Sequence, residues 1–179
     1  MGLAYQEFYT YDDYKHWEGK WELIDGIPYA MAPAPVKKHQ LLETKIIFEL
    51  YNSLNCEKCE ILGEVDYKVN EETILKPDVV MTCNDKGDKY LIKAPEIIFE
   101  VISPSTARRD ETIKFKIYEE EGVKFLILVY PNDSVAKIYK NENGFKKIGD
   151  FSEGVFDFDI CGVKVDFDNV FKAQLNKTK

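Results

Sequence analysis

Apolar and polar residues alternate in several short segments of the chain, a pattern typical of β-strands with one buried face. Residues 20–32 read as two such strands around Asp25 and Gly26, a dipeptide that favours a tight turn between antiparallel strands. Residues 64–70 also alternate, and a turn leads from them to another strand around 77–82. The pattern therefore predicts an N-terminal β-hairpin and, later, two consecutive strands.

Two longer runs, 95–104 and 123–131, are apolar at almost every position. Such runs are typical of central strands that are covered on both faces. Glu100 interrupts the first run. A buried carboxylate is unfavourable unless it is paired or binds a cation, so Glu100 is a candidate functional residue.

Two segments have the spacing of helices. From His39, apolar residues recur three and four positions apart at Leu42, Ile46 and Leu50, and polar residues end this helix after position 51. A second helix is predicted within 103–122, between the two central strands. Ser105 or Thr106 is a suitable first residue for it, and Gly122 a suitable last one.

The second helix contains a lysine that is able to approach the sheet. At about 100° per residue, Asp110, Ile113, Lys114 and Ile117 fall on one arc, which we expect to face the strands. Lys114 lies at the margin of this arc, where its long stem can cross apolar surface while its ammonium reaches a carboxylate. Lys116 points nearly the opposite way and is expected in solvent.

The C-terminal part of the chain is predicted to be rich in strands. Residues 135–148 read as a hairpin with Asn143 and Gly144 at its turn, and 156–167 as two short strands. With no repeat or linker in evidence, the whole pattern predicts one α/β (α+β) domain over residues 1–179, its core at about 39–131. It contains a mixed β-sheet flanked by helices, an N-terminal β-hairpin and a β-rich C-terminal tail.

The amino-acid composition and net charge limit which kinds of partner the protein is expected to bind. The 179 residues are 45% hydrophobic, which suits a folded domain, and the net charge of -8 argues against broad adhesion to nucleic acid. This net charge is still compatible with an enzyme that binds nucleic acid through a local basic patch and metal ions. No apolar run approaches the roughly 18 residues of a membrane span. We therefore expect a cytoplasmic protein without membrane contact.

The cysteines include one metal-like motif. Cys56 and Cys59 form a CxxC pair, whereas Cys83 and Cys161 lie far away in the sequence. A structural zinc site usually needs a second close pair or two histidines. The simplest expectation is four reduced thiols, with a zinc site or redox chemistry as alternatives.

Asp78 and Glu100 lie in consecutive predicted strands. If these strands pair, the two carboxylates project from neighbouring backbones, where a cation between them would relieve their repulsion. Oxygen ligands of this kind suit Mg²⁺, and Lys114 can join them. Each residue also has an ordinary explanation: Asp78 as part of a turn, Lys114 paired with Asp110, and Glu100 in a salt bridge with Arg108 or Arg109.

The segment from 77 to 131 resembles the PD-(D/E)XK nuclease superfamily and, more narrowly, the Uma-type bacterial restriction-endonuclease-like proteins. The resemblance rests on Pro77-Asp78, the string EVISPST at 100–106, the spaced residues Asp110, Lys114 and Tyr118, and Gly122-Val123. The strings WELIDGIPYAMAPAP near the N-terminus and CGVKVDFDNVF near the C-terminus also resemble this family. The similarity therefore extends over nearly the whole chain.

The resemblance implies a restriction-endonuclease-like core and Mg²⁺ (or Mn²⁺) as the cofactor. Asp78 and Glu100 are implied as metal ligands, with the Val101 carbonyl as a third. Ile102 stands where the family's strand lysine is usual, so the catalytic lysine is implied to be Lys114 on the helix. A DNA substrate and a homodimer are the family expectation.

Two residues outside this block are accessory candidates. Glu22 in the hairpin can approach the metal or only anchor the hairpin, and His39 can contact phosphate or only begin a helix. The favoured hypothesis is a Mg²⁺-dependent DNA endonuclease. The alternative is a catalytically weak or inactive nuclease fold that acts as a nucleic-acid-binding or regulatory module.

Overall fold

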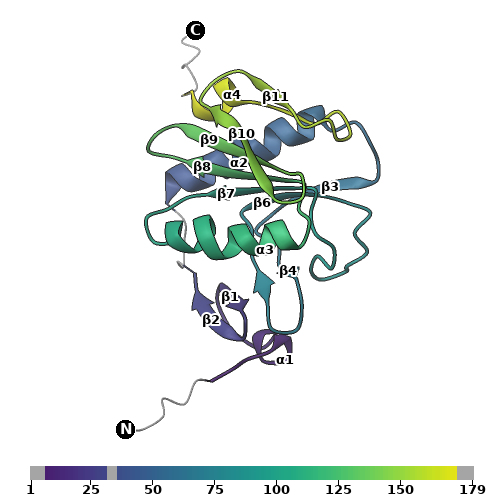
Figure 1. The fold of residues 1–179 in the computed structure, drawn as a ribbon, viewed down its shortest axis with the longest axis vertical. Coiled ribbons are helices and arrows are strands. Elements are labelled where there is room, and N and C mark those ends of the chain that lie inside the picture. The colour runs from purple at the N-terminus through teal and green to yellow at the C-terminus, as the bar shows by residue number, and fades with distance from the viewer. Residues whose placement is uncertain (1–6, 32–35, 173–179) are drawn as a thin grey trace.

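The computed structural model describes residues 7–31 and 36–172, and a six-stranded sheet forms its centre (Figure 1). The strand order in this sheet is β10-β9-β8-β7-β6-β3. The bounds are β3 Cys59–Gly63, β6 Val79–Cys83, β7 Ile97–Val101, β8 Phe125–Tyr130, β9 Val135–Asn141 and β10 Phe145–Phe151. Helices cover both faces, which confirms the expected α+β fold with a mixed sheet.

Strand β7 lies in the middle of the sheet, as its apolar run predicts. It pairs antiparallel with β6 and parallel with β8, and every residue of β6 and β7 is buried. Glu100 therefore sits in one of the least accessible strands of the molecule, with 2% of its surface exposed.

Helix α2 (Lys37–Ser53) covers one face of the sheet. Leu42, Ile46 and Leu50 are its buried residues, which confirms the predicted apolar stripe. They share a core cluster with the C-terminal elements β11 (Val155–Asp157), β12 (Lys164–Asp166) and α4 (Phe167–Phe171). The last part of the predicted β-rich tail, 155–171, is thus the outer layer on this face, whereas its first hairpin forms β9 and β10 of the large sheet.

The opposite face carries the second helix and a small N-terminal sheet (Figure 1). The small sheet has the order β2-β1-β5-β4, with bounds β1 Trp21–Ile24, β2 Ile27–Ala30, β4 Tyr67–Lys68 and β5 Ile74–Leu75. A short helix α1 (Tyr11–Tyr14) precedes it. Asp25 and Gly26 have φ of 50° and 74°, which matches the predicted tight turn of the β1–β2 hairpin.

The prediction for residues 64–70 was largely wrong. Only Tyr67–Lys68 is a strand there, and it belongs to the small sheet rather than adjoining β6. The backbone turns at Glu64, whose φ is 48°, so the alternating pattern does not continue as one strand. The neighbour of β6 on that side is instead β3, which sequence inspection missed because only four residues separate the CxxC motif from the turn at Glu64.

The helix after β7 is not α-helical throughout. It contains a π-helical segment η1 (Arg109–Lys114) followed by α3 (Phe115–Glu120), and it ends near Gly122, whose φ is 81° as expected for such a residue. The wider π turn changes which residues face the sheet. Ile113 is 38% exposed, contrary to prediction, while the buried positions are Asp110, Lys114 and Tyr118.

The four cysteines lie together in spite of their separation in sequence. Cys56 is joined to Cys161 and Cys59 to Cys83 as disulfides, so the expectation of reduced thiols is wrong for this structure. None of the helices in the described ranges, 7–31 and 36–172, is long and apolar enough to cross a membrane.

The α2 interface should contribute strongly to stability. Ile46 is fully buried, so Ile46→Ala is expected to lower the free energy of unfolding by about 2–5 kcal/mol. Leu41 lies on the same helix but is 49% exposed, and Leu41→Ala is expected to change the free energy of unfolding by less than about 0.5 kcal/mol. Urea denaturation of both variants measures this, and equal effects would contradict the packing described.

Candidate active site

Strands β6 and β7 bring Asp78 and Glu100 face to face. Val79 pairs with Phe99 in the antiparallel register, so Asp78 lies opposite Glu100 at the next position. Both side chains project to the face that carries α3, because Val80 and Ile98, two positions away, pack in the cluster on that face. The predicted pairing of the two carboxylates on neighbouring strands is therefore present.

Two contacts fix the position of the Asp78 carboxylate, directly before the first residue of β6. Its Oδ2 accepts a hydrogen bond from the Val101 N–H at 2.6 Å and lies 3.5 Å from Nε2 of His39. These contacts connect β6 to the strand that carries Glu100 and to the start of α2. The carboxylate thus has a fixed position at the meeting point of three elements.

Lys114 is enclosed by carboxylates. Its Nζ lies 2.7 Å from Glu100 Oε1, 2.9 Å from Glu22 Oε1 and 3.4 Å from Asp110 Oδ1. The residue is 2% exposed, so it is deeper than the helix margin where the 100° spacing puts it. The Tyr118 hydroxyl donates to Glu100 Oε1 at 2.7 Å and adds a second donor to the same oxygen.

Glu22 is fully buried and anchors the N-terminal hairpin to this cluster. It accepts a hydrogen bond from the Lys76 N–H at 3.0 Å, and its Oε2 lies 3.1 Å from Nε of Arg109. Glu22 therefore reaches the site and does not only anchor the hairpin, which were the two possibilities that the sequence left open. Arg109 pairs with Glu22, whereas Glu100 pairs with Lys114.

Burial and neighbouring opposite charges act in opposite directions on the pKa values of Glu100 and Lys114. Burial raises the pKa of Glu100 above its usual value, although the Lys114 ammonium acts to lower it. Burial alone would lower the pKa of Lys114, but Glu100 and Glu22 outweigh it and raise that pKa well above normal. Burial also raises the pKa of Asp110. Lys114 is consequently a charged ammonium at neutral pH.

His39 forms a second group with Glu43, which sequence inspection missed. Burial lowers the His39 pKa, but hydrogen bonding to Asp78 and Glu43 more than reverses this and raises it to about 10. Nδ1 of His39 lies 3.3 Å from Glu43 Oε1, and the donor atoms of His39, Glu43 and Asp78 all lie within 4.8 Å of one another. The spacing of four between His39 and Glu43 on α2 was the available signal, because such residues share a helix face.

The donor set fits a divalent cation. Three cations, Lys114, Arg109 and the protonated His39, lie among five carboxylates: Glu22, Glu43, Asp78, Glu100 and Asp110. When all are ionised, two negative charges remain uncompensated, which a divalent ion would neutralise. Two ion pairs beside this set, Glu22 Oε2 with Arg109 Nε at 3.1 Å and His39 Nδ1 with Glu43 Oε1 at 3.3 Å, lack a well-aligned hydrogen bond. Carboxylate oxygens match the preferences of both Mg²⁺ and Mn²⁺.

The cluster opens into a cleft with a volume of about 150 Å³. Asp78, Glu100, Val101 and Lys114 form its floor, and cationic and hydroxyl side chains surround it. The other lining residues are Lys20, Met31, Val36, His39, Glu64, Ser103, Ser105, Thr106, Arg109 and Asp110. Every site residue proposed from the sequence therefore lines this cleft or, in the case of Glu22, contacts a residue that does. Lys116, by contrast, has a side chain that is 73% exposed, as predicted.

Comparison with known proteins identifies the family. The family model Uma2, described as "Putative restriction endonuclease", matches residues 5–153. The chain belongs to the Uma2 family. An uncharacterised protein of Synechocystis, slr1290, is 31% identical over 144 residues, which is 74% of this chain and 75% of the relative.

The Uma2 fold is also seen in a solved structure. The crystal structure described as "a putative nuclease belonging to DUF820", from Anabaena variabilis, superposes with a TM-score of 0.72 at 14% identity. The match covers 90% of this chain and 97% of the other. The Uma2 chain therefore has a nuclease-type fold of the restriction-endonuclease-like class, and the family supports a nuclease-type function.

The Glu22 contacts predict a large effect on stability in this Uma2 protein. Glu22→Ala leaves the buried Lys114 and the half-buried Arg109 short of a carboxylate and should lower the free energy of unfolding by about 3–5 kcal/mol. Glu72, an exposed residue of the loop before β5, provides the matched control, and Glu72→Ala should change it by less than about 0.5 kcal/mol. A loss below about 1 kcal/mol for Glu22→Ala in urea denaturation, typical of an exposed pair, would contradict an anchoring role.

Proposed function

We propose that this Uma2 protein is a Mg²⁺-dependent (or Mn²⁺-dependent) endonuclease that hydrolyses phosphodiester bonds in DNA. One observation carries the proposal: two carboxylates on adjacent strands face each other at a cleft, with the Lys114 ammonium 2.7 Å from one of them. This arrangement combines oxygen ligands for a metal with a fixed positive charge. Both are what the hydrolysis of a negatively charged phosphodiester requires.

Asp78 and Glu100 would hold the metal, with the Val101 carbonyl as a third oxygen ligand. A bound Mg²⁺ or Mn²⁺ would lower the pKa of water and neutralise charge on the phosphate. The protein supplies rigidity, since β6 and β7 fix both carboxylates. The Val101 N–H contact with Asp78 prevents that side chain from turning away from the cleft.

Lys114 would act as an electrostatic residue rather than as a base. The surrounding carboxylates keep it protonated, so it has no lone pair with which to take a proton from water. Its ammonium can instead donate to the attacking water or to a phosphate oxygen, and stabilise the charge that develops there. Glu22 and Asp110 would position it for this role.

The entrance of the cleft suits a phosphate backbone. Lys37 and Lys38 are exposed in the first turn of α2, next to His39, whose ring faces the cleft. Ser103, Ser105 and Thr106 add hydroxyl donors on the opposite side. A local patch of this kind, with Lys37 and Lys38 beside the cleft, is compatible with a net charge of -8.

Cleavage of a supercoiled plasmid in the presence of Mg²⁺ or Mn²⁺ tests the proposal. Asp78→Asn and Glu100→Gln keep the side-chain shape but weaken metal binding, and Lys114→Ala removes the fixed charge. Each is expected to reduce the cleavage rate by about 100-fold or more, comparable with the loss of one transition-state donor. Lys116→Ala, on the same helix but exposed, is the matched control and should leave the rate unchanged.

Metal-dependent nicking that survives both Asp78→Asn and Glu100→Gln would refute the site. A protein that binds Mn²⁺ in calorimetry and retains DNA in a shift assay, yet cuts neither DNA nor RNA, would instead support the binding-module alternative. Circular dichroism of each variant shows whether the fold is retained.

A further inference from the structure

All four cysteines of the chain gather at one edge of the large sheet. Cys56 follows the end of α2, Cys59 begins β3, Cys83 ends β6, and Cys161 lies between β11 and β12. Three of the sulfurs, from Cys56, Cys59 and Cys161, lie within 4.8 Å of one another, and Cys83 adjoins Cys59. The nuclease proposal uses none of these residues.

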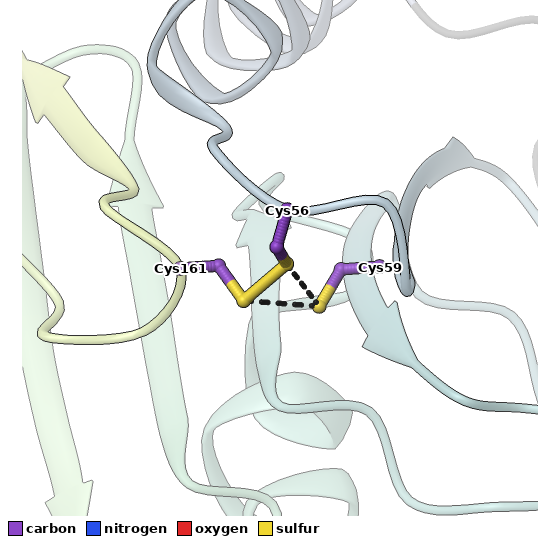
Figure 2. Close-up of side chains that lie close together, drawn as sticks. All are labelled: Cys56, Cys59 and Cys161. Carbon is purple, nitrogen blue, oxygen red and sulfur yellow. Dashed lines mark hydrogen bonds between the residues drawn. A yellow bond between two sulfur atoms is a disulfide. The ribbon is translucent and has the colours of Figure 1, made fainter.

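The sulfurs contact one another across the two disulfides as well as within them. Cys59 Sγ lies 3.2 Å from Cys56 Sγ and 3.4 Å from Cys161 Sγ (Figure 2). One tetrahedral zinc ion, with Zn–S of about 2.3 Å, would hold four sulfurs about 3.8 Å apart. The sulfurs of Cys56, Cys59 and Cys161 lie within 4.8 Å of one another, as three ligands of such an ion would, and Cys83 is joined to Cys59.

The backbone supports a metal site at this position. Cys59 and Cys83 are directly opposite on paired strands, with Cα atoms 3.9 Å apart, which is shorter than the roughly 4.4–6.8 Å usual for a disulfide. Both side chains point to the α2 face, because both belong to the core cluster there. The CxxC spacing of Cys56 and Cys59 is that of a zinc-binding turn.

Backbone hydrogen bonds hold the two loops of the cluster together. The Asn55 N–H donates to the Cys161 carbonyl at 2.8 Å, and the Asn84 N–H donates to the Lys58 carbonyl at 2.8 Å. Gly162 permits this approach: its φ is 72°, and a Cβ there would lie 3.4 Å from Asn55. The positions of the sulfurs are therefore set by the main chain.

We propose that these four cysteines, as thiolates, bind one structural Zn²⁺ that fixes the C-terminal layer to the sheet. The cysteines are synthesised as thiols, so binding needs no electron transfer: each thiol releases its proton to solvent as its sulfur binds the ion. The disulfide form reaches the thiol form by gaining two electrons and two protons per bond from a thiol or phosphine reductant.

The site is separate from the active-site cleft. His39 and Ser53 lie near opposite ends of α2, 14 residues apart, which corresponds to about 21 Å of helix. Zinc at the cysteines and a divalent ion at Asp78 can therefore be distinguished by mutation. The failure of one proposal leaves the other intact.

Zinc content of the full chain, purified with a phosphine reductant and without chelator, tests the proposal. We expect one zinc per chain, and cobalt-loaded protein should show the thiolate-to-cobalt absorption of a four-sulfur site. Cys56→Ser and Cys161→Ser should each weaken zinc binding by at least about 100-fold, the upper end of what loss of a supporting residue costs. Asp78→Asn is the control and should retain the ion.

Alkylation of the wild-type protein keeps the test independent of how the variants fold. Zinc should protect all four thiols from a maleimide reagent, and a strong chelator should expose them, as read by intact mass. Reduced protein that takes up no zinc or cobalt would overturn the proposal. It would also be overturned if the zinc were lost in Asp78→Asn but retained in Cys161→Ser.

Discussion

The buried pair of Glu100 and Lys114 is the interaction on which the rest of the site depends. Neither charge is stable alone in a central strand or beneath a helix, since transfer of an unpaired ion from water to the interior is strongly unfavourable. The pair, 2.7 Å apart, determines how the helix must sit on the sheet. Glu22, Asp110 and Tyr118 then complete the environment of these two residues.

The π-helical segment Arg109–Lys114 follows from this requirement. A regular α-helix with the same sequence would turn the apolar residue Ile113 toward the sheet, as its spacing suggests. With the wider turn, Asp110 and Lys114 stay on the buried side, where the 100° spacing also puts them, Tyr118 of α3 joins them, and Ile113 is 38% exposed. The helix thus loses the apolar contact of Ile113 with the sheet and places the Lys114 ammonium beside Glu100. Such a departure from local packing rules is expected at functional sites.

Much of the fold could be predicted because its main signals are local. The hydrophobic stripe of α2 and the apolar run around Glu100 each identify one element and its buried side. Glu43 and strand β3 were missed because their importance comes from partners distant in sequence: Asp78 for Glu43, and β6 for β3. The cysteines were misjudged for the same reason, since only the folded chain brings Cys161 to the CxxC pair.

Helix α2 explains why two clusters of metal-ligand type can coexist in so small a domain. Its N-terminal part carries His39, which lines the cleft, and Glu43, which pairs with His39, while the loop after its last turn carries Cys56 beside the other cysteines. The ligand atoms differ accordingly: oxygen and imidazole at one end, sulfur at the other. Hard oxygen ligands select Mg²⁺ or Mn²⁺, whereas soft thiolates select zinc. If both proposed ions bind, α2 would hold them near opposite ends of one rigid helix, with the oxygen-rich set suited to Mg²⁺ or Mn²⁺ and the thiolate set suited to zinc.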